Sequence, residues 1–252
     1  MSTMKSSPAT KSASSSLVLL FRLIEANDWQ EFTSKFLTDS EGRKTFQFLA
    51  ALVSKSSSFN GMTILHACAR FDPPAVLILR IIELSPDAVR SQDCLDRTPL
   101  HVAAGCHAST AVMRVLVDHY PEACMAQDKD GRTPLHMACD SSCELFEDDK
   151  REMERPPPSY RTIAVLLSAK LDSAVLEDKD GMSAIEYALC SDADIKTVRL
   201  IQRAAQRVHL KKKEVETSQM MARSKMTKRG SISATAPGKG FKPKGLLGAP
   251  SA

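Results

Sequence analysis

The sequence predicts an all-α solenoid, which is a linear stack of short helix pairs, and two observations support this prediction. The phrase Thr98-Pro99-Leu100-His101 returns as Thr133-Pro134-Leu135-His136, with a near copy at Thr63-Ile64-Leu65-His66. The intervals are 98 − 63 = 35 and 133 − 98 = 35 residues. An apolar stripe with spacings of three and four follows each copy, as in a helix buried on one side. A fixed period of this size indicates repeated supersecondary units that expose a binding surface.

The first helix of each unit is expected to begin at the repeated phrase. Thr98 and Thr133 suit the N-cap position, and the proline that follows suits the first helical position, where its missing N–H costs nothing. Turn-forming residues come before the phrase, as in Asn60-Gly61 and in Asp-Lys-Asp-Gly at 128–131. We therefore expect short β-hairpin fingers between the units.

The second helix of each unit is expected from its apolar stripe. The stripe residues are Leu77, Ile78, Ile81 and Ile82 in the first unit, Val112, Met113, Leu116 and Val117 in the second, and Ile163, Leu166 and Leu167 in the third. A fourth copy of the phrase, altered to Ser-Ala-Ile-Glu, begins 183 − 133 = 50 residues after the third. The third unit therefore carries an insertion of 50 − 35 = 15 residues.

Residues 61–212 resemble an ankyrin-repeat protein. The resemblance rests on the period of the repeat, on the phrase Asp-x-x-Gly-x-Thr-Pro-Leu-His and on the small pairs Ala103-Ala104 and Ala138-Cys139. The chain departs from the family pattern in three ways. Pro-Asp-Ala at 86–88 and Pro-Glu-Ala at 121–123 replace the Gly-Ala-Asp that is usual between repeats, Asp96 stands in place of the turn glycine, and the fourth unit lacks Thr-Pro and His. Asp tolerates positive φ, and a degenerate unit is expected at the end of a stack. The resemblance implies that the phrase histidines bond to backbone groups that link adjacent hairpins. The structural signature is then Thr63, His66, Thr98, Pro99, His101, Thr133, Pro134 and His136.

The predicted domain order is a stack between two disordered tails. In chain order we expect a Ser-rich tail at 1–16, a helical cap or degenerate repeat at 17–60, repeat 1 at 61–95, repeat 2 at 96–130, repeat 3 at 131–180, a degenerate repeat 4 at 181–212 and a basic, mostly disordered tail at 213–252. Seven serines, two lysines and no acidic residue among the first 16 residues are typical of disorder. A targeting peptide is the competing interpretation of that composition.

The insertion at 143–158 lies between the two expected helices of repeat 3. Its mixed charges, ended by Pro156-Pro157-Pro158, predict a solvated loop. The alternative is a short acidic recruitment motif around Leu145-Phe146. In either case we expect the insertion at the edge opposite the hairpin tips, away from the main surface.

Charge is strongly segregated along the chain. Residues 207–252 contain 11 basic and 2 acidic residues, a net charge of 11 − 2 = +9, although the whole chain has a net charge of only +4. Such a tail can contact nucleic acid or anionic lipid weakly, act as a nuclear import signal or fold back on the acidic body. Ser231 follows Lys228-Arg229-Gly230 and is therefore a candidate phosphosite.

The sequence offers no catalytic, cofactor-binding or metal-binding motif, so we expect neither an enzyme nor a cofactor. The seven cysteines are scattered and are best interpreted as small, reduced core residues, and a metal site at Cys139 and Cys143 would need two further ligands. No apolar run reaches the roughly 18 residues that cross a bilayer. We expect a monomeric protein of the cytoplasm or the nucleus.

The function predicted from these features is that of a noncatalytic adaptor, which presents the concave surface of its repeats to a protein partner that the sequence does not identify. We call this surface, made of the hairpin tips and the first helices, the inner face. Its predicted contact residues precede each capping residue or follow each phrase: Met62, Arg97, Arg132, Met182, Ala67, Val102, Met137 and Tyr187. The alternative function is a regulator that engages nucleic acid or an anionic membrane through the basic tail.

Overall fold

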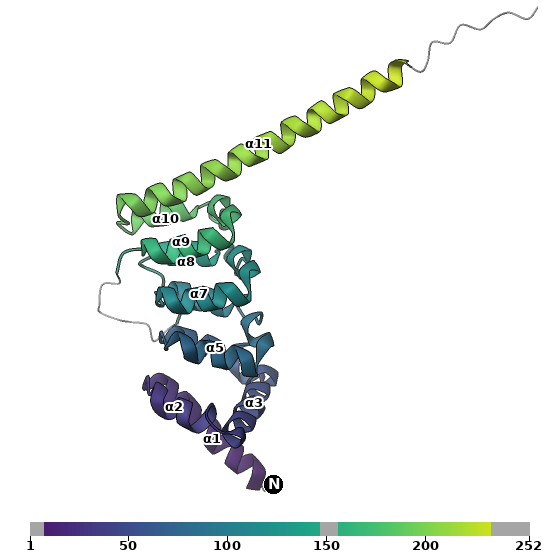
Figure 1. The fold of residues 1–252 in the computed structure, drawn as a ribbon. Helices are drawn as coiled ribbons and strands as arrows, with labels where there is room; N and C mark the ends of the chain where they lie inside the picture. Colours follow the sequence, from purple (N-terminus) through teal and green to yellow (C-terminus); the bar gives the residue numbers. More distant parts are fainter. Residues whose placement is uncertain (1–7, 147–155, 233–252) are drawn as a thin grey trace, which may run out of the picture. The chain divides into compact units, whose positions relative to one another are not determined.

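The computed structural model describes residues 8–146 and 156–232, and the described chain is helical (Figure 1). Contacts divide the chain into two compact bodies, Met1–Val208 and His209–Ala252. The first body holds a helical cap and four stacked helix pairs in its described part. The described part of the second body is the continuation of the last helix.

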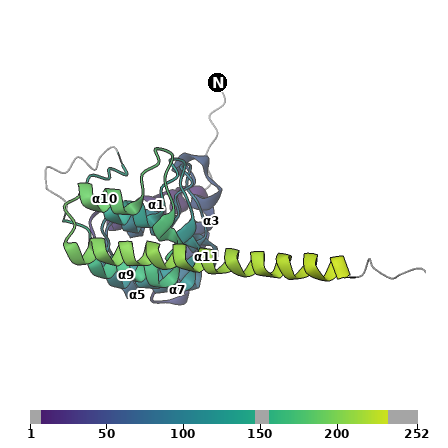
Figure 2. The same cartoon turned by 90° about the horizontal axis from the view of Figure 1, so that it is seen from above.

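The helix pairs form two layers in the first body. Repeat 1 pairs α4 (Ile64–Arg70) with α5 (Ala75–Leu84), repeat 2 pairs α6 (Pro99–Gly105) with α7 (Thr110–His119), repeat 3 pairs α8 (Pro134–Cys139) with α9 (Tyr160–Ala169), and repeat 4 pairs α10 (Ala184–Cys190) with the start of α11 (Ile195–Ile232). The first helices α4, α6, α8 and α10 contact one another in succession, and so do α5, α7 and α9. Figure 2, a view along the stack, shows α5, α7 and α9 in one layer and α10 in the other. The short 3₁₀ helices η2 (Pro86–Val89), η3 (Pro121–Met125) and η4 (Leu171–Val175) follow the second helices.

Each first helix begins with a capping box, as the repeated phrase requires. Thr63, Thr98, Thr133 and Ser183 are the N-cap residues, and in each box the side chain three residues later bonds back to the N-cap backbone. Burial of small residues such as Cys68 and Ala103 lets the neighbouring helices approach closely. The apolar stripes of the second helices are buried, including Ile78, Met113 and Leu166.

The loops between repeats are tight turns, so the expected β-hairpin fingers are wrong for the described residues, which contain one isolated bridge, between Glu177 and Ser183, and no strand. Successive turns are joined by single backbone bonds, such as Lys129 N–H to Leu95 O (3.0 Å), and such a bond is too little for a ladder. Asp96 has φ 60°, so it does take the left-handed conformation of the glycine that it replaces.

The cap consists of α1 (Pro8–Glu25), α2 (Trp29–Phe36), α3 (Ser40–Lys55) and the 3₁₀ helix η1 (Ser57–Phe59). Helix α1 begins at Pro8, so the disorder expected over 1–16 is wrong for residues 8–16, and residues 1–7 lie outside the described part. Proline suits a first helical position, and the Ala, Ser and Lys residues that follow do not interrupt a helix that continues into buried turns. Phe32 and Phe46 fill the centre of the cap.

Helix α11 continues through residue 232, so the disorder expected from residue 213 onward is wrong up to that point. Residues 211–222 are mostly good helix formers without Gly or Pro, which explains the continuation. Ser231 lies in the last turn of this helix, and residues 233–252 lie outside the described part. Among the described helices, none combines the length and the apolar character that a membrane span needs.

Candidate functional site

The three phrase histidines bond to the turns that join successive repeats, beneath the inner face. In repeat 1, His66 Nδ1 accepts the Thr63 backbone N–H (3.1 Å), while its Nε2 bonds to the carbonyl oxygen of Arg97 in repeat 2 (3.0 Å). His101 Nε2 likewise bonds to the Arg132 oxygen at 3.3 Å, and His136 Nε2 to the Leu176 oxygen at 3.1 Å. This pattern requires the neutral ring with its proton on Nε2.

Burial keeps these imidazoles neutral. It lowers the pKa of His66 and of His101 to about 4, because a charged ring would lose its hydration there, although carbonyl acceptors partly oppose the shift. The pKa of His136 is lowered for the same main reason. The three side chains therefore hold the repeats together and are not exposed bases or metal ligands.

Arg97 does not face solvent, which corrects the prediction that it is an exposed contact residue. Its Nη2 lies 2.7 Å from Asp93 Oδ2, and the two side chains are 7% and 0% exposed. The corresponding Arg132 in repeat 3 is 30% exposed and lies 3.4 Å from Asp140. The difference arises because a segment of the insertion covers Arg97.

Val102 and Met137 are buried within the helix layers, so the expectation that they face a partner is wrong, whereas Ala67, although buried, lines a cavity of this face. The fourth residue of this series, Tyr187, is half-buried. Its hydroxyl donates to Asp178 Oδ2 (2.7 Å), and burial, followed by this bond, raises the pKa of Tyr187 to about 12.

Two parts of the inner face remain accessible. At repeats 3 and 4, the Arg132 guanidinium lies 5.5 Å from the centre of the Tyr187 ring, so these two predicted residues come together. Met182 is half-buried in the turn of repeat 4. At the other end, the structure has a cavity of about 430 Å³ with an apolar wall from α1, η1 and α4. Its lining includes Phe21, Phe59, Met62, Ala67, Arg70 and Phe71.

The start of the insertion lies on the inner face, which corrects the prediction that it sits at the opposite edge. The carbonyl oxygen of Leu145 accepts a bond from Arg97 Nη1 at 2.9 Å. The Phe146 ring centre lies 4.2 Å from the Arg70 guanidinium and 5.2 Å from that of Arg97. We call residues 143–146 the strap. A 35-residue period contains no information about an inserted segment, so sequence reasoning placed it wrongly.

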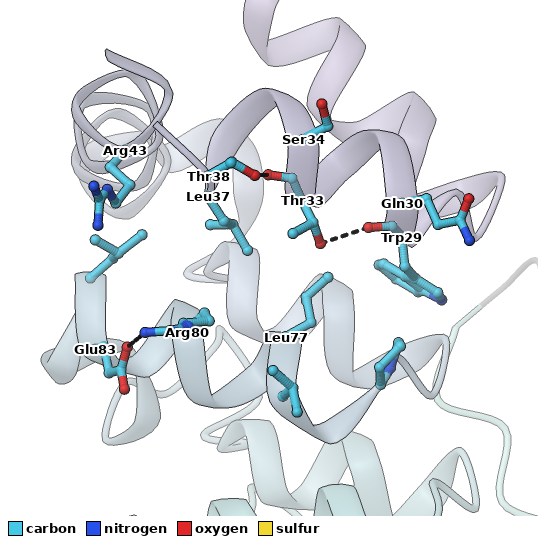
Figure 3. Close-up of a pocket in the computed structure, with 13 residues that line it drawn as sticks. Trp29, Gln30, Thr33, Ser34, Leu37, Thr38, Arg43, Leu77, Arg80 and Glu83 are labelled. Atoms are coloured by element: carbon cyan, nitrogen blue, oxygen red, sulfur yellow. Dashed lines mark hydrogen bonds and ion pairs between the residues drawn. The ribbon is translucent and has the colours of Figure 1, made fainter. Parts of the chain in front are cut away.

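A second groove lies outside the inner face, between α2 of the cap and α5 of repeat 1 (Figure 3). Its volume is about 700 Å³. Trp29 and Leu37 line it from the cap side, and Leu77 and the Arg80–Glu83 ion pair (2.9 Å) from the α5 side. Val76, also in the lining, is 68% exposed.

In the described part of the chain, no group of three or more His, Cys, Asp or Glu side chains could hold a metal ion. All seven cysteines lie in that part and are free thiols. Burial raises the pKa of Cys68 and of Cys139 far above the usual value, and that of Cys124 to about 11, so these thiols stay protonated.

Stacked helix pairs, capping boxes at a fixed period and histidine links between turns define a helical repeat protein. Residues 65–147 match the family model of ankyrin repeats in three copies. The chain therefore contains ankyrin repeats. Ankyrin repeats generally mediate protein–protein interaction and are generally noncatalytic. No curated protein matches the chain.

Proposed function

We propose that this chain is a noncatalytic adaptor that captures a protein partner on the inner face of its repeats. The observation that supports the proposal is the pair of accessible areas on that face. One is the apolar cavity beside Met62, and the other is the group formed by Arg132, Met182 and Tyr187. Arginine, aromatic and methionine side chains are enriched in the energetic centres of protein interfaces.

The proposal is tested by quantitative capture from extracts of the source cells. The variant Met62→Asp/Met182→Asp places a charge in each accessible area without touching the capping boxes or the histidine links. Val76→Asp is the control, because it makes one such change to aspartate at a residue that is 68% exposed on the outer layer. We expect wild type and Val76→Asp to retain the same partner in high salt and the inner-face variant to lose it. Retention by all three, with unchanged circular dichroism, rejects the inner face as the site.

A second candidate function is supported by the charge of the C-terminal region, which has a net charge of +9 over residues 207–252. In the described part of that region, Lys211, Lys212 and Lys213 are exposed on α11. Here the partner is RNA, DNA or anionic lipid, and affinity falls steeply with salt. Deletion of residues 223–252, which removes seven of the 11 basic residues, then weakens binding, whereas the adaptor function predicts no effect of this deletion on capture.

The proposed adaptor acts in the cytoplasm or the nucleus. Free thiols at all seven cysteines, including the exposed Cys94 and Cys190, fit a reducing compartment. Fluorescence microscopy of the chain with a C-terminal tag tests this location, and accumulation in a secretory compartment contradicts it.

A further inference from the structure

Leu145 of the strap occupies the space that the missing side chain of Gly105 leaves on repeat 2. We call this space the slot. A Cβ atom added at Gly105 would lie 2.7 Å from Leu145 Cδ1 and 3.3 Å from Cys143 Sγ, so only glycine leaves room for the leucine as it stands. Gly105 is the last residue of α6 and has no positive φ that would require glycine. Its small size therefore serves the contact with Leu145.

Comparison between repeats shows what the strap replaces. At intervals of 35 residues, Gly105 corresponds to Asp140 in repeat 3, and Arg97 corresponds to Arg132. In repeat 3, the arginine and the aspartate pair with each other across α8. In repeat 2 the aspartate is missing, and Arg97 Nη1 donates instead to the main-chain oxygen of Leu145. In repeat 2 the strap therefore supplies the acceptor for this arginine, whereas in repeat 3 Asp140 of the same repeat supplies it.

The adjacent phenylalanine has its own site. Phe146 stacks against the Arg70 and Arg97 guanidinium groups, which come from two different repeats. Arg70 also lines the apolar cavity that contains Met62, so the slot, the two arginines and the cavity form one continuous surface. This surface recognises a leucine side chain, the leucine carbonyl and an aromatic ring in consecutive positions.

We propose that the inner face of repeats 1 and 2 is a recognition site for an extended protein segment with adjacent leucine and phenylalanine, and that Leu145-Phe146 is a tethered copy of that ligand. This inference rests on the proposed adaptor function and specifies the partner's chemistry. A tethered segment competes at an effective concentration in the millimolar range for short linkers. A partner must therefore displace the strap, so only a segment that binds the site tightly enough to compete with the tethered copy is captured.

The test uses the full chain and a synthetic peptide with the sequence of residues 141–146, carrying Cys143→Ser to prevent oxidation. Binding is followed by the NMR shifts of the Gly105 and Arg97 amides, up to millimolar peptide. The variant Leu145→Ala/Phe146→Ala empties the site, and we expect it to bind the peptide at least about tenfold more tightly than wild type, since the tethered competitor is gone. Glu144→Ala is the matched control, because this exposed strap residue leaves both anchors in place and should behave as wild type.

Two further binding measurements test whether the peptide binds in the slot. Adding Gly105→Leu to the emptied variant fills the slot and should abolish binding, as should replacing Leu-Phe by Ala-Ala in the peptide. Thermal melting of each variant confirms that it is folded. Equal binding by wild type and the emptied variant, absence of binding by both, or equal binding of the Ala-Ala peptide overturns the inference. Because the peptide assay needs no cellular partner, its failure is distinct from a failure of the capture experiment.

Discussion

Arg97 and Asp93 form a buried, two-pronged ion pair at the base of the turn in repeat 2. Arg97 Nε and Nη2 lie 2.8 Å and 2.7 Å from Asp93 Oδ2. Asp93 Oδ1 accepts the backbone N–H groups of Leu95 and Arg97, both at 2.9 Å. The carboxylate therefore fixes the turn and the guanidinium together, and the arginine holds the strap through its third nitrogen, Nη1.

Removal of this arginine is expected to be costly. Arg97→Ala leaves Asp93 buried without its counter-charge, and we expect a loss of about 3 to 5 kcal/mol in the free energy of unfolding. Arg132→Ala removes a partly exposed pair and is expected to cost about 1 kcal/mol or less. Urea unfolding followed by circular dichroism measures both variants. Equal losses in the two would show that the burial of Arg97 has no energetic consequence.

Stability should fall as the pH decreases from 6.5 to 4. The unfolded chain protonates His66 and His101 near pH 6.5, but burial holds their pKa at about 4 in the folded chain. The unfolded state therefore binds more protons between these values, and acidification favours it by roughly 3 kcal/mol for each histidine. Above pH 6.5 both states are neutral, and these histidines give no pH dependence.

Urea titrations at a series of pH values measure this effect, and His101→Ala provides the comparison. The variant should be less stable at neutral pH because it loses hydrogen bonds worth on the order of 1 kcal/mol apiece. Its stability should also depend less on pH by up to about one proton. An unchanged slope in the variant would mean that His101 titrates normally in the folded chain.

Gly131 and Gly181 form a matched pair for the contact between successive turns. Both have positive φ, 78° and 76°, but a Cβ at Gly131 would lie 2.9 Å from Lys179 N, whereas nothing lies within 4 Å of one at Gly181. Replacement by alanine should cost roughly 1 to 2 kcal/mol at each from the left-handed backbone alone. We expect Gly131→Ala to cost more and to lower the melting temperature further. A larger cost at Gly181 would contradict the observed packing of the turns.

Much of this fold could be predicted from the phrase that recurs every 35 residues, because N-caps and apolar stripes are local signals. The positive φ of Asp96 followed from the same alignment. The exposure of Arg97 did not, because it depends on contacts across the fold. Leu145, which bonds to Arg97, is 48 residues away in the chain. One local signal for the turns was available in the sequence. An aspartate stands four residues before Arg97, Arg132 and Met182, and it fixes each turn by accepting the backbone N–H of that residue.

Ser231 remains a predicted phosphosite, although it lies in the last turn of α11 and not in an unfolded tail. A phosphate there adds nearly two negative charges close to Lys228 and Arg229, at the helix end where negative charge is unfavourable. We expect Ser231→Glu to weaken binding to anionic vesicles at low salt and to shorten the helix. Deletion of residues 223–252 sets the lower limit of binding. If wild type, Ser231→Glu and the deletion bind alike, the tail is neither an anchor nor a switch.

Because of the histidine links, truncation from the two ends of the stack should have unequal effects on stability. His66 and His101 each bond to a carbonyl of the following repeat, whereas His136, the last of the series, bonds to Leu176, which lies beyond the insertion at the end of the same repeat. Repeat 4 has Glu186 at the equivalent position, and this carboxylate turns back to Ser183 in its own capping box (2.6 Å). A fragment that ends before Leu176 therefore leaves a buried imidazole without its acceptor, whereas shortening from the N-terminal side removes each histidine together with its own repeat. Truncation should thus be tolerated better from the N-terminal side, and the segment around Leu176, at the end of repeat 3, is the part of the stack on which His136 depends.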